Sequence, residues 1–436
     1  MFTIKEVLTM EVAPALGCTE PVAIALGAAA AASLLEGDVT HVDVAVDPNI
    51  YKNGLAVSIP GTDGLSGLDT AAAIGAVAGE PSLRLEVLDP VDDRAVASAQ
   101  QLIHDGIVDV HLLADHQGLY IHTTVTSGTD RAECIIQDSH DNIVALRLNG
   151  RELSDHPLLL DEDGPQGHSR ADLEAWLKTL SLKDLLAMVD DLDDEDFVFL
   201  QAGVDQNMRL AEHGLKFGPG LNVGMTLERL VRQRLLNKDM MMAARILASA
   251  AADARMAGVK LPAMSSAGSG NHGLTAILPI RAVKDYIECD DKVFLEAIAL
   301  SHILTAYVKT HTGRLSAVCG CSIAAGAGAT EGVTYLLGGN LKHIAGAITN
   351  LTEDLAGVIC DGAKAGCSLK LATAAGAAVQ AALFALQGVN VLATDGIIGH
   401  SPEQTMQNIG TLSTQGMMET DRTILKIMLE KKFQNV

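Results

Sequence analysis

Small apolar residues at helical spacing recur along most of this chain, and they limit what it can fold into. Apolar residues make up 48% of the 436 residues, but aromatic residues only 3%. Alanine and glycine dominate segments such as 21–35, so helices built from them can pack with their backbones close together. A chain of this length can bury a large core and form two or three domains. A compact, mainly helical body is therefore expected.

The hydrophobic pattern divides the chain into two parts. Residues 4–35 are typical of helix with an interruption at 14–17, and residues 39–46 alternate as a half-buried strand does. Three further strands with turns between them are predicted at 120–127, 131–138 and 142–148. Beyond residue 170 almost every segment is typical of helix, among them 171–189, 227–257, 291–310, 324–337, 341–356 and 369–386. We therefore expect an α+β fold, in which an N-terminal α+β domain (1–150) and a linker (151–170) precede a larger all-α C-terminal domain (171–436), on which the first domain packs.

Charge and cysteine usage narrow the class of protein. The net charge is −23, which repels nucleic-acid backbones and anionic lipid, so neither partner is expected. The start of the chain lacks the pattern of a signal peptide, and segment 21–35 is too short to span a bilayer. Seven cysteines, an odd number, argue against a disulfide framework. We expect a cytoplasmic protein, and its small-residue helices could supply the interface of a homo-oligomer such as a dimer.

Four of the seven cysteines lie between residues 319 and 367. Cys360 and Cys367 bracket the segment CDGAKAGC, which is too rich in glycine for a simple helix and could let two sulfurs converge. With Cys319, three thiolates from two segments could hold a cubane iron–sulfur cluster through three of its irons. Inert core thiols are the alternative. Zinc is disfavoured because no CxxC pair is present. If residues 319–321 are helical, Cys321 cannot point the same way as Cys319.

The segment LPAMSSAGSGNHG contains a formal GxGxxG match at residues 268–273. A dinucleotide site would need a strand directly before it and a βαβ unit around it, and neither is clear. A nest of backbone N–H groups and hydroxyls at a helix start, which binds a carboxylate, is a second interpretation. A tight structural loop is the third. The candidate substrate-binding residues here are Ser265, Ser266, Gly268, Ser269, Gly270, Asn271 and His272.

A second group of candidates lies near the N-terminus. Cys18 falls at a predicted helix start, where the helix dipole would lower its pKa and make it a base or nucleophile. A lone buried cysteine without function is the alternative. Asn49, Lys52 and Asn53 follow a predicted strand and could reach a substrate, or could form an ordinary turn.

Taken together, the motifs resemble those of a known family. EVAPALGCTEPVAIALG, DPNIYKNG, AADARMAG, LPAMSSAGSGNHG, RLSAVCG and VICDGAKAGC occur in the order seen in the L-cysteine desulfidase family, which is related to the α chain of bacterial iron–sulfur L-serine dehydratase. The resemblance implies an oxygen-sensitive [4Fe–4S] cluster and conversion of L-cysteine to pyruvate, ammonia and hydrogen sulfide without pyridoxal phosphate. It implies that Cys319, Cys360 and Cys367 are the cluster ligands. It also implies that Cys18 is the active-site thiol and that the loop 265–273 holds the substrate carboxylate.

The chain departs from the serine dehydratases in two ways. Their last two ligand cysteines are spaced more widely, and they carry a C-terminal cysteine that reaches the cluster, whereas this sequence ends KKFQNV. We therefore expect an open fourth iron that binds the substrate thiolate, with Cys18 the first candidate for the base and Lys52 the second. A serine dehydratase using the same site, a nicotinamide oxidoreductase and a non-catalytic iron–sulfur sensor are the alternatives.

Overall fold

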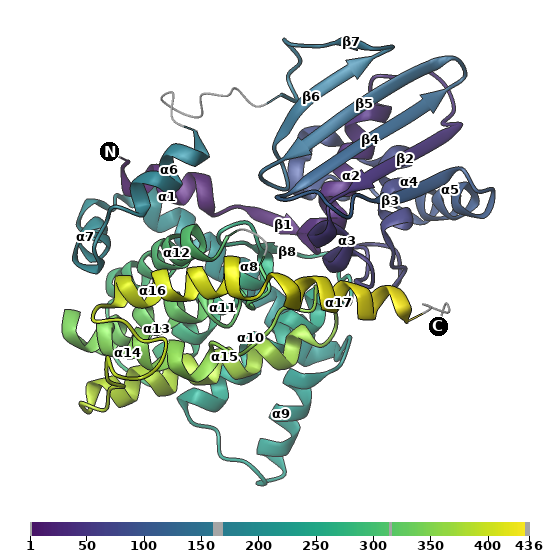
Figure 1. Cartoon of the computed structure of the whole chain (residues 1–436). Coiled ribbons are helices and arrows are strands. Elements are labelled where there is room, and N and C mark those ends of the chain that lie inside the picture. The colour runs from purple at the N-terminus through teal and green to yellow at the C-terminus, as the bar shows by residue number, and fades with distance from the viewer. Residues whose placement is uncertain (1, 160–168, 314–315, 432–436) are drawn as a thin grey trace.

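The computed structural model describes residues 2–159, 169–313 and 316–431. It contains a lobe built on a β-sheet and a larger lobe of packed helices (Figure 1). The predicted α+β fold, with the sheet in the N-terminal part and helices in the C-terminal part, is confirmed.

The sheet lobe holds six strands in the described part of the chain. Their order is β3-β2-β4-β5-β6-β7, with β2 and β3 parallel and the other neighbours antiparallel. Alternate side chains of β2 are buried, as its sequence pattern predicts. The strands are β2 (His41–Val46), β3 (Val108–Leu112), β4 (Tyr120–Ser127), β5 (Asp130–Gln137), β6 (Ile143–Leu148) and β7 (Arg151–Glu152).

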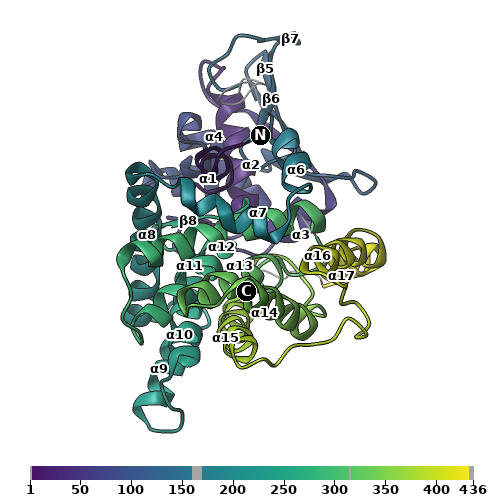
Figure 2. The same cartoon turned by 90° about the vertical axis from the view of Figure 1, so that its left-hand side faces the viewer.

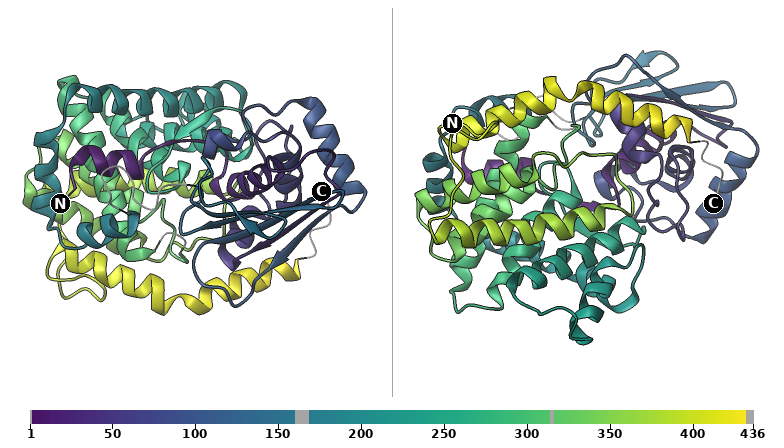
Figure 3. Two further views of the ribbon diagram at one scale, coloured as in Figure 1. Left: turned by 90° about the horizontal axis from the view of Figure 1, so that it is seen from above. Right: turned by 60° about the horizontal axis from the view of Figure 1, so that its bottom comes forward.

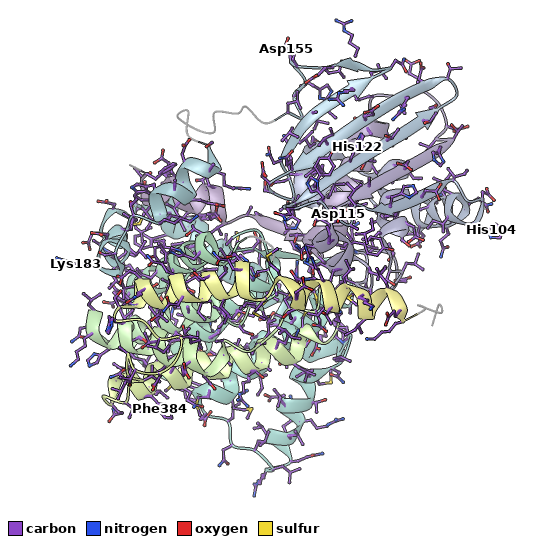
Figure 4. All side chains as sticks on the ribbon, viewed as in Figure 1. His104, Asp115, His122, Asp155, Lys183 and Phe384 are labelled. Carbon is purple, nitrogen blue, oxygen red and sulfur yellow. The ribbon has the colours of Figure 1, made fainter. Side chains whose placement is uncertain are left out.

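One face of this sheet is covered by two helices that pack on each other: α2 (Thr19–Ala32), which contacts β4 and β5, and α4 (Leu68–Ala78), which contacts β2 and β3. A Cβ placed on Gly75 would collide with the Ala25 carbonyl, so the two helices touch through their backbones, as the small residues predict. The helices η1 (Pro81–Glu86) and α5 (Asp93–His104) complete the lobe. The other face is polar: His122, labelled in Figure 4, lies there with Nε2 3.2 Å from Glu133 Oε2.

The helical lobe is a layered core of apolar helices from which α9 (Val223–Arg232) projects (Figure 2). Its main helices are α8 (Asp194–Phe217), α10 (Met240–Met256), α11 (Gly270–Lys284), α12 (Asp291–Thr312), α13 (Ala324–Leu336), α14 (Leu341–Leu355) and α15 (Cys367–Leu386). Among the described residues, α12 and α15 are long and apolar enough to cross a membrane, but 89% and 61% of their apolar windows are buried. Both pack as helices of the protein core.

Both ends of the chain cross between the lobes. Helix α1 (Ile4–Glu11) packs in the helical core, so the sheet lobe's own core begins near Ala15, not at residue 1. Strand β1 (Pro14–Leu16) then pairs with β8 (Pro262–Met264) of the helical lobe. Near the C-terminus, α16 (Pro402–Thr411), the turn η3 (Leu412–Gly416) and α17 (Met418–Glu430) lead back to α3 (Pro48–Gly54) of the sheet lobe (Figure 3).

The boundary between the two predicted domains falls partly outside the described residues. Most of the predicted linker, residues 160–168, lies there. The long helix expected after it is divided into α6 (Arg170–Leu177), α7 (Leu182–Ala187) and η2 (Met188–Asp191), each of the first two with its own serine cap. A capping hydroxyl satisfies the free N–H groups of a new helix start, which is why the segment breaks at Ser181.

Glu331 of α13 offers a test of the helical core. Its side chain is fully buried, and neither carboxyl oxygen has a hydrogen-bond partner in the described structure. Burial raises the pKa of Glu331 well above the usual 4.5, because a low dielectric disfavours the charged form. The folded protein therefore keeps a proton that the unfolded chain releases above this value, and stability must fall as the pH rises.

We expect Glu331→Gln to remove this pH dependence, which reaches about 1.4 kcal/mol per pH unit. Urea unfolding of both proteins between about pH 5 and 8 measures the free energy of unfolding, and the advantage of the variant should grow with pH. If the free energy of unfolding changed with pH in the same way in both proteins, Glu331 would not be a buried neutral acid.

Candidate active site

Two segments of the helical lobe bring three of the predicted site cysteines to one cavity. Val318 and Ile359 form an isolated antiparallel bridge. Beside it, the Cys319 N–H donates to the Val358 carbonyl at 2.8 Å, and the Cys360 N–H donates to the Ala317 carbonyl at 2.6 Å. After a loop, Cys367 begins α15. The thiols that line this cavity at the junction of the lobes include those of Cys319, Cys360 and Cys367.

Cys321 also lines the cavity, contrary to the expectation that it would point away. Residues 320–323 form turns before α13 begins, so the divergence of neighbouring helical positions does not apply. A hydrogen bond between Cys321 and Cys319 is the main cause that lowers the pKa of the Cys319 thiol and raises that of Cys321. The positive charge of Lys370 also lowers the pKa of Cys319. The surroundings of Cys319 thus favour a thiolate.

These donors suit an iron–sulfur cluster better than a single metal ion. In the described ranges, no three His, Cys, Asp or Glu side chains lie close enough together to hold one ion. A cubane cluster makes a different demand, because each cysteine binds its own iron and the sulfurs stand apart around the cluster. Lys370 lines the same cavity, held by hydrogen bonds from its Nζ to the Ile359 carbonyl and to Asp361. A cluster held by thiolates is negatively charged, and the Lys370 cation beside these cysteines would stabilise that charge.

The loop between β8 and α11 forms another wall of the cavity. The Asn207 amide pairs with both the N–H and the carbonyl of Met264, at 2.9 and 3.2 Å, and so holds the strand before the loop. The chain then turns through Ala267 and Gly268, at φ 45° and 79°, a region that favours glycine. Helix α11 starts at Gly270. Because β1, antiparallel to it, is the one strand that pairs with β8 among the described residues, no βαβ unit surrounds this motif there, and its dinucleotide-binding interpretation is wrong.

Most of the loop's candidate residues face the cavity. Ser265, Gly268, Ser269, Asn271 and His272 line it. Ser266 does not, because its hydroxyl is bound at 2.9 Å to Nδ1 of His302, and the Gly270 backbone lies against Arg255. A Cβ on Gly320 would collide with Nε2 of His272, so the loop directly adjoins the turn between Cys319 and Cys321.

Cys18 lies where predicted, but its chemistry differs from the prediction. It is the N-cap of α2 and packs with Val57 and Met256 in a small apolar cluster that Cys367 contacts. Its Sγ donates to Oε2 of Glu20 at 2.9 Å. Burial raises the pKa of Cys18 well above its usual range, and the charge of Glu20 raises it further. The predicted lowering by the helix dipole is therefore wrong, because desolvation outweighs it.

Glu20 is a cavity residue that the sequence did not reveal. Burial acts to raise its pKa, but the charge of His140 and hydrogen bonds from Cys18 and Asn53 outweigh it, so the pKa of Glu20 is lowered. Asn53 Nδ2 donates to Oε1 at 2.9 Å, and His140 Nε2 lies 3.9 Å from the same oxygen. Its position two residues after Cys18 was the available signal. His140, in the turn between β5 and β6, gave none.

Arg255 of α10 is a second such residue, and it ties three segments together at the cavity. It is 2% exposed. One terminal nitrogen donates to Oδ1 of Asn271 at 2.9 Å, and the other donates to the carbonyl of Gly17, next to Cys18. In the described structure its Nε has no hydrogen-bond partner. A buried guanidinium so placed fixes both the start of α2 and the start of α11 against α10.

Comparison with known proteins agrees with this arrangement. The sequence profile of the family described as "Serine dehydratase alpha chain" matches residues 84–426. The chain belongs to the serine dehydratase alpha chain family. It is also 64% identical over 434 residues to a UPF0597 protein of Desulfatibacillum aliphaticivorans, with 99% of each chain covered. A UPF0597 protein of Clostridioides difficile is 42% identical over 423 residues, covering 97% of this chain and 98% of that protein. The names of these two relatives state no activity.

The match to the serine dehydratase alpha chain family includes most of the residues of the helical lobe that line the cavity. Arg255, the loop 265–273 and the four cysteines between 319 and 367 lie inside it, whereas Cys18 and Glu20 lie before its first residue. The relatives align along 97% or more of this chain and so cover the Cys18 segment as well.

Of the three candidates around α3, only Asn53 lines the cavity. The segment forms a short helix rather than a turn, with Asp47 as its cap accepting from the Asn49 N–H at 2.7 Å. Lys52 is buried, and its Nζ forms a 2.6 Å ion pair with Asp421 of α17. The structure therefore places Lys52 and Asn49 outside the cavity.

Proposed function

We propose that this protein is an iron–sulfur-dependent β-elimination lyase that converts L-cysteine to pyruvate, ammonia and hydrogen sulfide. One observation supports this most: Cys319, Cys360 and Cys367 share a cavity with Cys18 and the loop 265–272. Membership of the serine dehydratase alpha chain family supports the same class of reaction. Because such a cluster and its thiols need a reducing compartment, we also propose a cytoplasmic location.

In this proposal Cys319, Cys360 and Cys367 hold a [4Fe–4S] cluster. When bound, the cluster supplies a Lewis-acidic iron that makes the β-substituent a better leaving group. The substrate carboxylate binds at the start of α11, where free backbone N–H groups and the helix dipole favour an anion. Arg255 holds Asn271 at this position.

The proton on the substrate α-carbon is removed by Cys18. Sγ of Cys18 donates a hydrogen bond to Oε2 of Glu20 at 2.9 Å. In the elimination step Sγ accepts the proton from Cα while its own proton passes to Oε2, so Glu20 is an ionised carboxylate when the substrate binds and carries the proton only after Cα has lost it. Because Cys18 and Glu20 are both buried, little water competes for these protons. Lys52, engaged with Asp421, acts by positioning α3 rather than as a base.

Serine is the competing substrate, because the family profile carries the name of a serine dehydratase. The test is anaerobic purification, cluster reconstitution, and iron and sulfide analysis, followed by assays with L-cysteine and L-serine at equal concentrations. We expect about four irons per chain and sulfide release from cysteine at a higher kcat/KM than pyruvate release from serine. Faster turnover of serine would replace the desulfidase with a dehydratase. Protein that holds a normal cluster but acts on neither amino acid would indicate a sensor.

A further inference from the structure

We infer that Glu20 binds the α-ammonium group of the substrate, so that the site accepts free α-amino acids and rejects the matching α-hydroxy acids. This inference rests on the proposed function, because it assigns a specificity residue within the same cavity. Glu20 lines that cavity at the first turn of α2 and is 7% exposed.

The contacts of Glu20 prepare a buried negative charge. Asn53 donates to Oε1 at 2.9 Å, and Cys18 and Thr19 donate to Oε2 at 2.9 and 3.3 Å. The N-terminus of α2 adds a positive dipole end. The charge of His140 and these dipoles keep the carboxylate ionised, but the dipoles supply no full counter-charge. A buried ion without a full counter-charge gains most from a cationic ligand.

The other carboxylates of the cavity already have arginine partners. Glu11 and Asp141 both lie 3.8 Å from nitrogens of Arg170. Within the described ranges, no lysine or arginine forms an ion pair with Glu20, and His140, at 3.9 Å, is its one ion-pair neighbour. Glu20 is thus the acidic residue of this cavity best placed to receive an ammonium group.

The positions of the surrounding groups match the three substituents of a small amino acid. Arg255, which is hydrogen-bonded to Asn271 at the start of α11, places a positive charge at the proposed binding site of the substrate carboxylate. Cys319, Cys360 and Cys367 lie where the β-substituent of the substrate is proposed to bind. Cys18 donates to Glu20, lies within electrostatic range of Arg255, and belongs to a small apolar cluster that Cys367 contacts. An amino-acid zwitterion with its carboxylate near Arg255 and its ammonium group near Glu20 therefore presents its α-carbon near Cys18.

The test compares L-cysteine with 3-mercaptolactate, in which a hydroxyl replaces the amino group. For protein that turns cysteine over, inhibition by mercaptolactate gives its Ki against the KM of cysteine. For protein that binds cysteine without turnover, calorimetry with the cluster in place gives the Kd of each. We expect the wild type to favour the amino acid by at least about 100-fold, since a site built to bind one polar group binds a ligand that lacks this group far more weakly. Glu20→Gln should reduce this preference below about 10-fold, because a neutral amide no longer favours a cation. Glu20→Asp, which keeps the charge, should retain part of it.

Glu11→Gln is the matched control, because it makes the same change in the same cavity at a carboxylate that Arg170 already pairs. The preference of the Glu11→Gln variant for L-cysteine over 3-mercaptolactate should stay at the wild-type value. An unchanged preference in Glu20→Gln with a wild-type circular dichroism melt, or a collapse in Glu11→Gln instead, would overturn the inference. If the wild type binds cysteine but eliminates nothing, the proposed function fails, whereas the calorimetric preference still decides the role of Glu20.

Discussion

Cys360→Ser is expected to lower the iron content of anaerobically reconstituted protein from about four per chain to below about one, and to abolish elimination activity. Serine oxygen is a far poorer iron ligand than thiolate, and two remaining cysteines cannot hold the cluster firmly. The fold should survive, because the segment is fixed by backbone contacts: the Cys360 N–H donates to the Ala317 carbonyl, and Val318 bridges Ile359. Iron analysis and the visible spectrum of the cluster measure the loss.

Cys289→Ser provides the matched control for this experiment. Cys289 lies in the helical lobe, partly buried against its core, but does not line the cavity. The control should keep its iron and its activity. A Cys360→Ser protein with a full complement of iron, or equal loss in both variants, would remove the cluster from this cavity and with it the proposed chemistry.

Arg255→Met is expected to lower kcat/KM by about 100- to 1,000-fold while the cluster remains. The variant loses two hydrogen bonds from a charged donor, each worth about 1.5–3 kcal/mol. It also leaves Oδ1 of Asn271 and the carbonyl of Gly17 without the guanidinium that joins them. The wall that binds the carboxylate and the segment that carries Cys18 should then shift relative to each other. The effect should appear mainly as a raised KM, if Arg255 holds the binding geometry.

Arg245→Met is the control, because it removes the same side chain from the same helix at a position that packs against Gly376 of α15 and not on the cavity. It should change stability but leave KM near the wild-type value. Arg255→Lys keeps the charge but cannot reproduce the forked geometry, so its loss should be intermediate. A normal KM in Arg255→Met would show that Arg255 serves the fold alone.

Periodicity in the sequence predicted the elements that are long and regular. Strand β4 was predicted at its observed bounds, and α12, α13 and α15 within a few residues, because each has a continuous burial pattern. Short or irregular elements were missed, among them β1, β8 and the capped helix α3. Three residues carry too little pattern to identify a strand, and β1 and β8 are stabilised by contacts distant in sequence: their pairing with each other and the Asn207 amide that binds Met264. Helix α1 was grouped with the wrong lobe, because its amphipathic face does not say which core it will join.

The same division applies to the candidate site. Spacing and residue type selected the three cysteines, the loop after β8 and Cys18 as candidates, because each lies in a short motif, and the resemblance to the L-cysteine desulfidase family gave them their expected roles. Only the tertiary structure decided what surrounds them. Burial raises the pKa of Cys18 against the local effect of its helix, and Arg255 and His140 reach the cavity beside Cys18 and Glu20 from segments that are distant in sequence. Desolvation and long-range charge depend on which segments pack together, and a local sequence pattern carries no record of that packing.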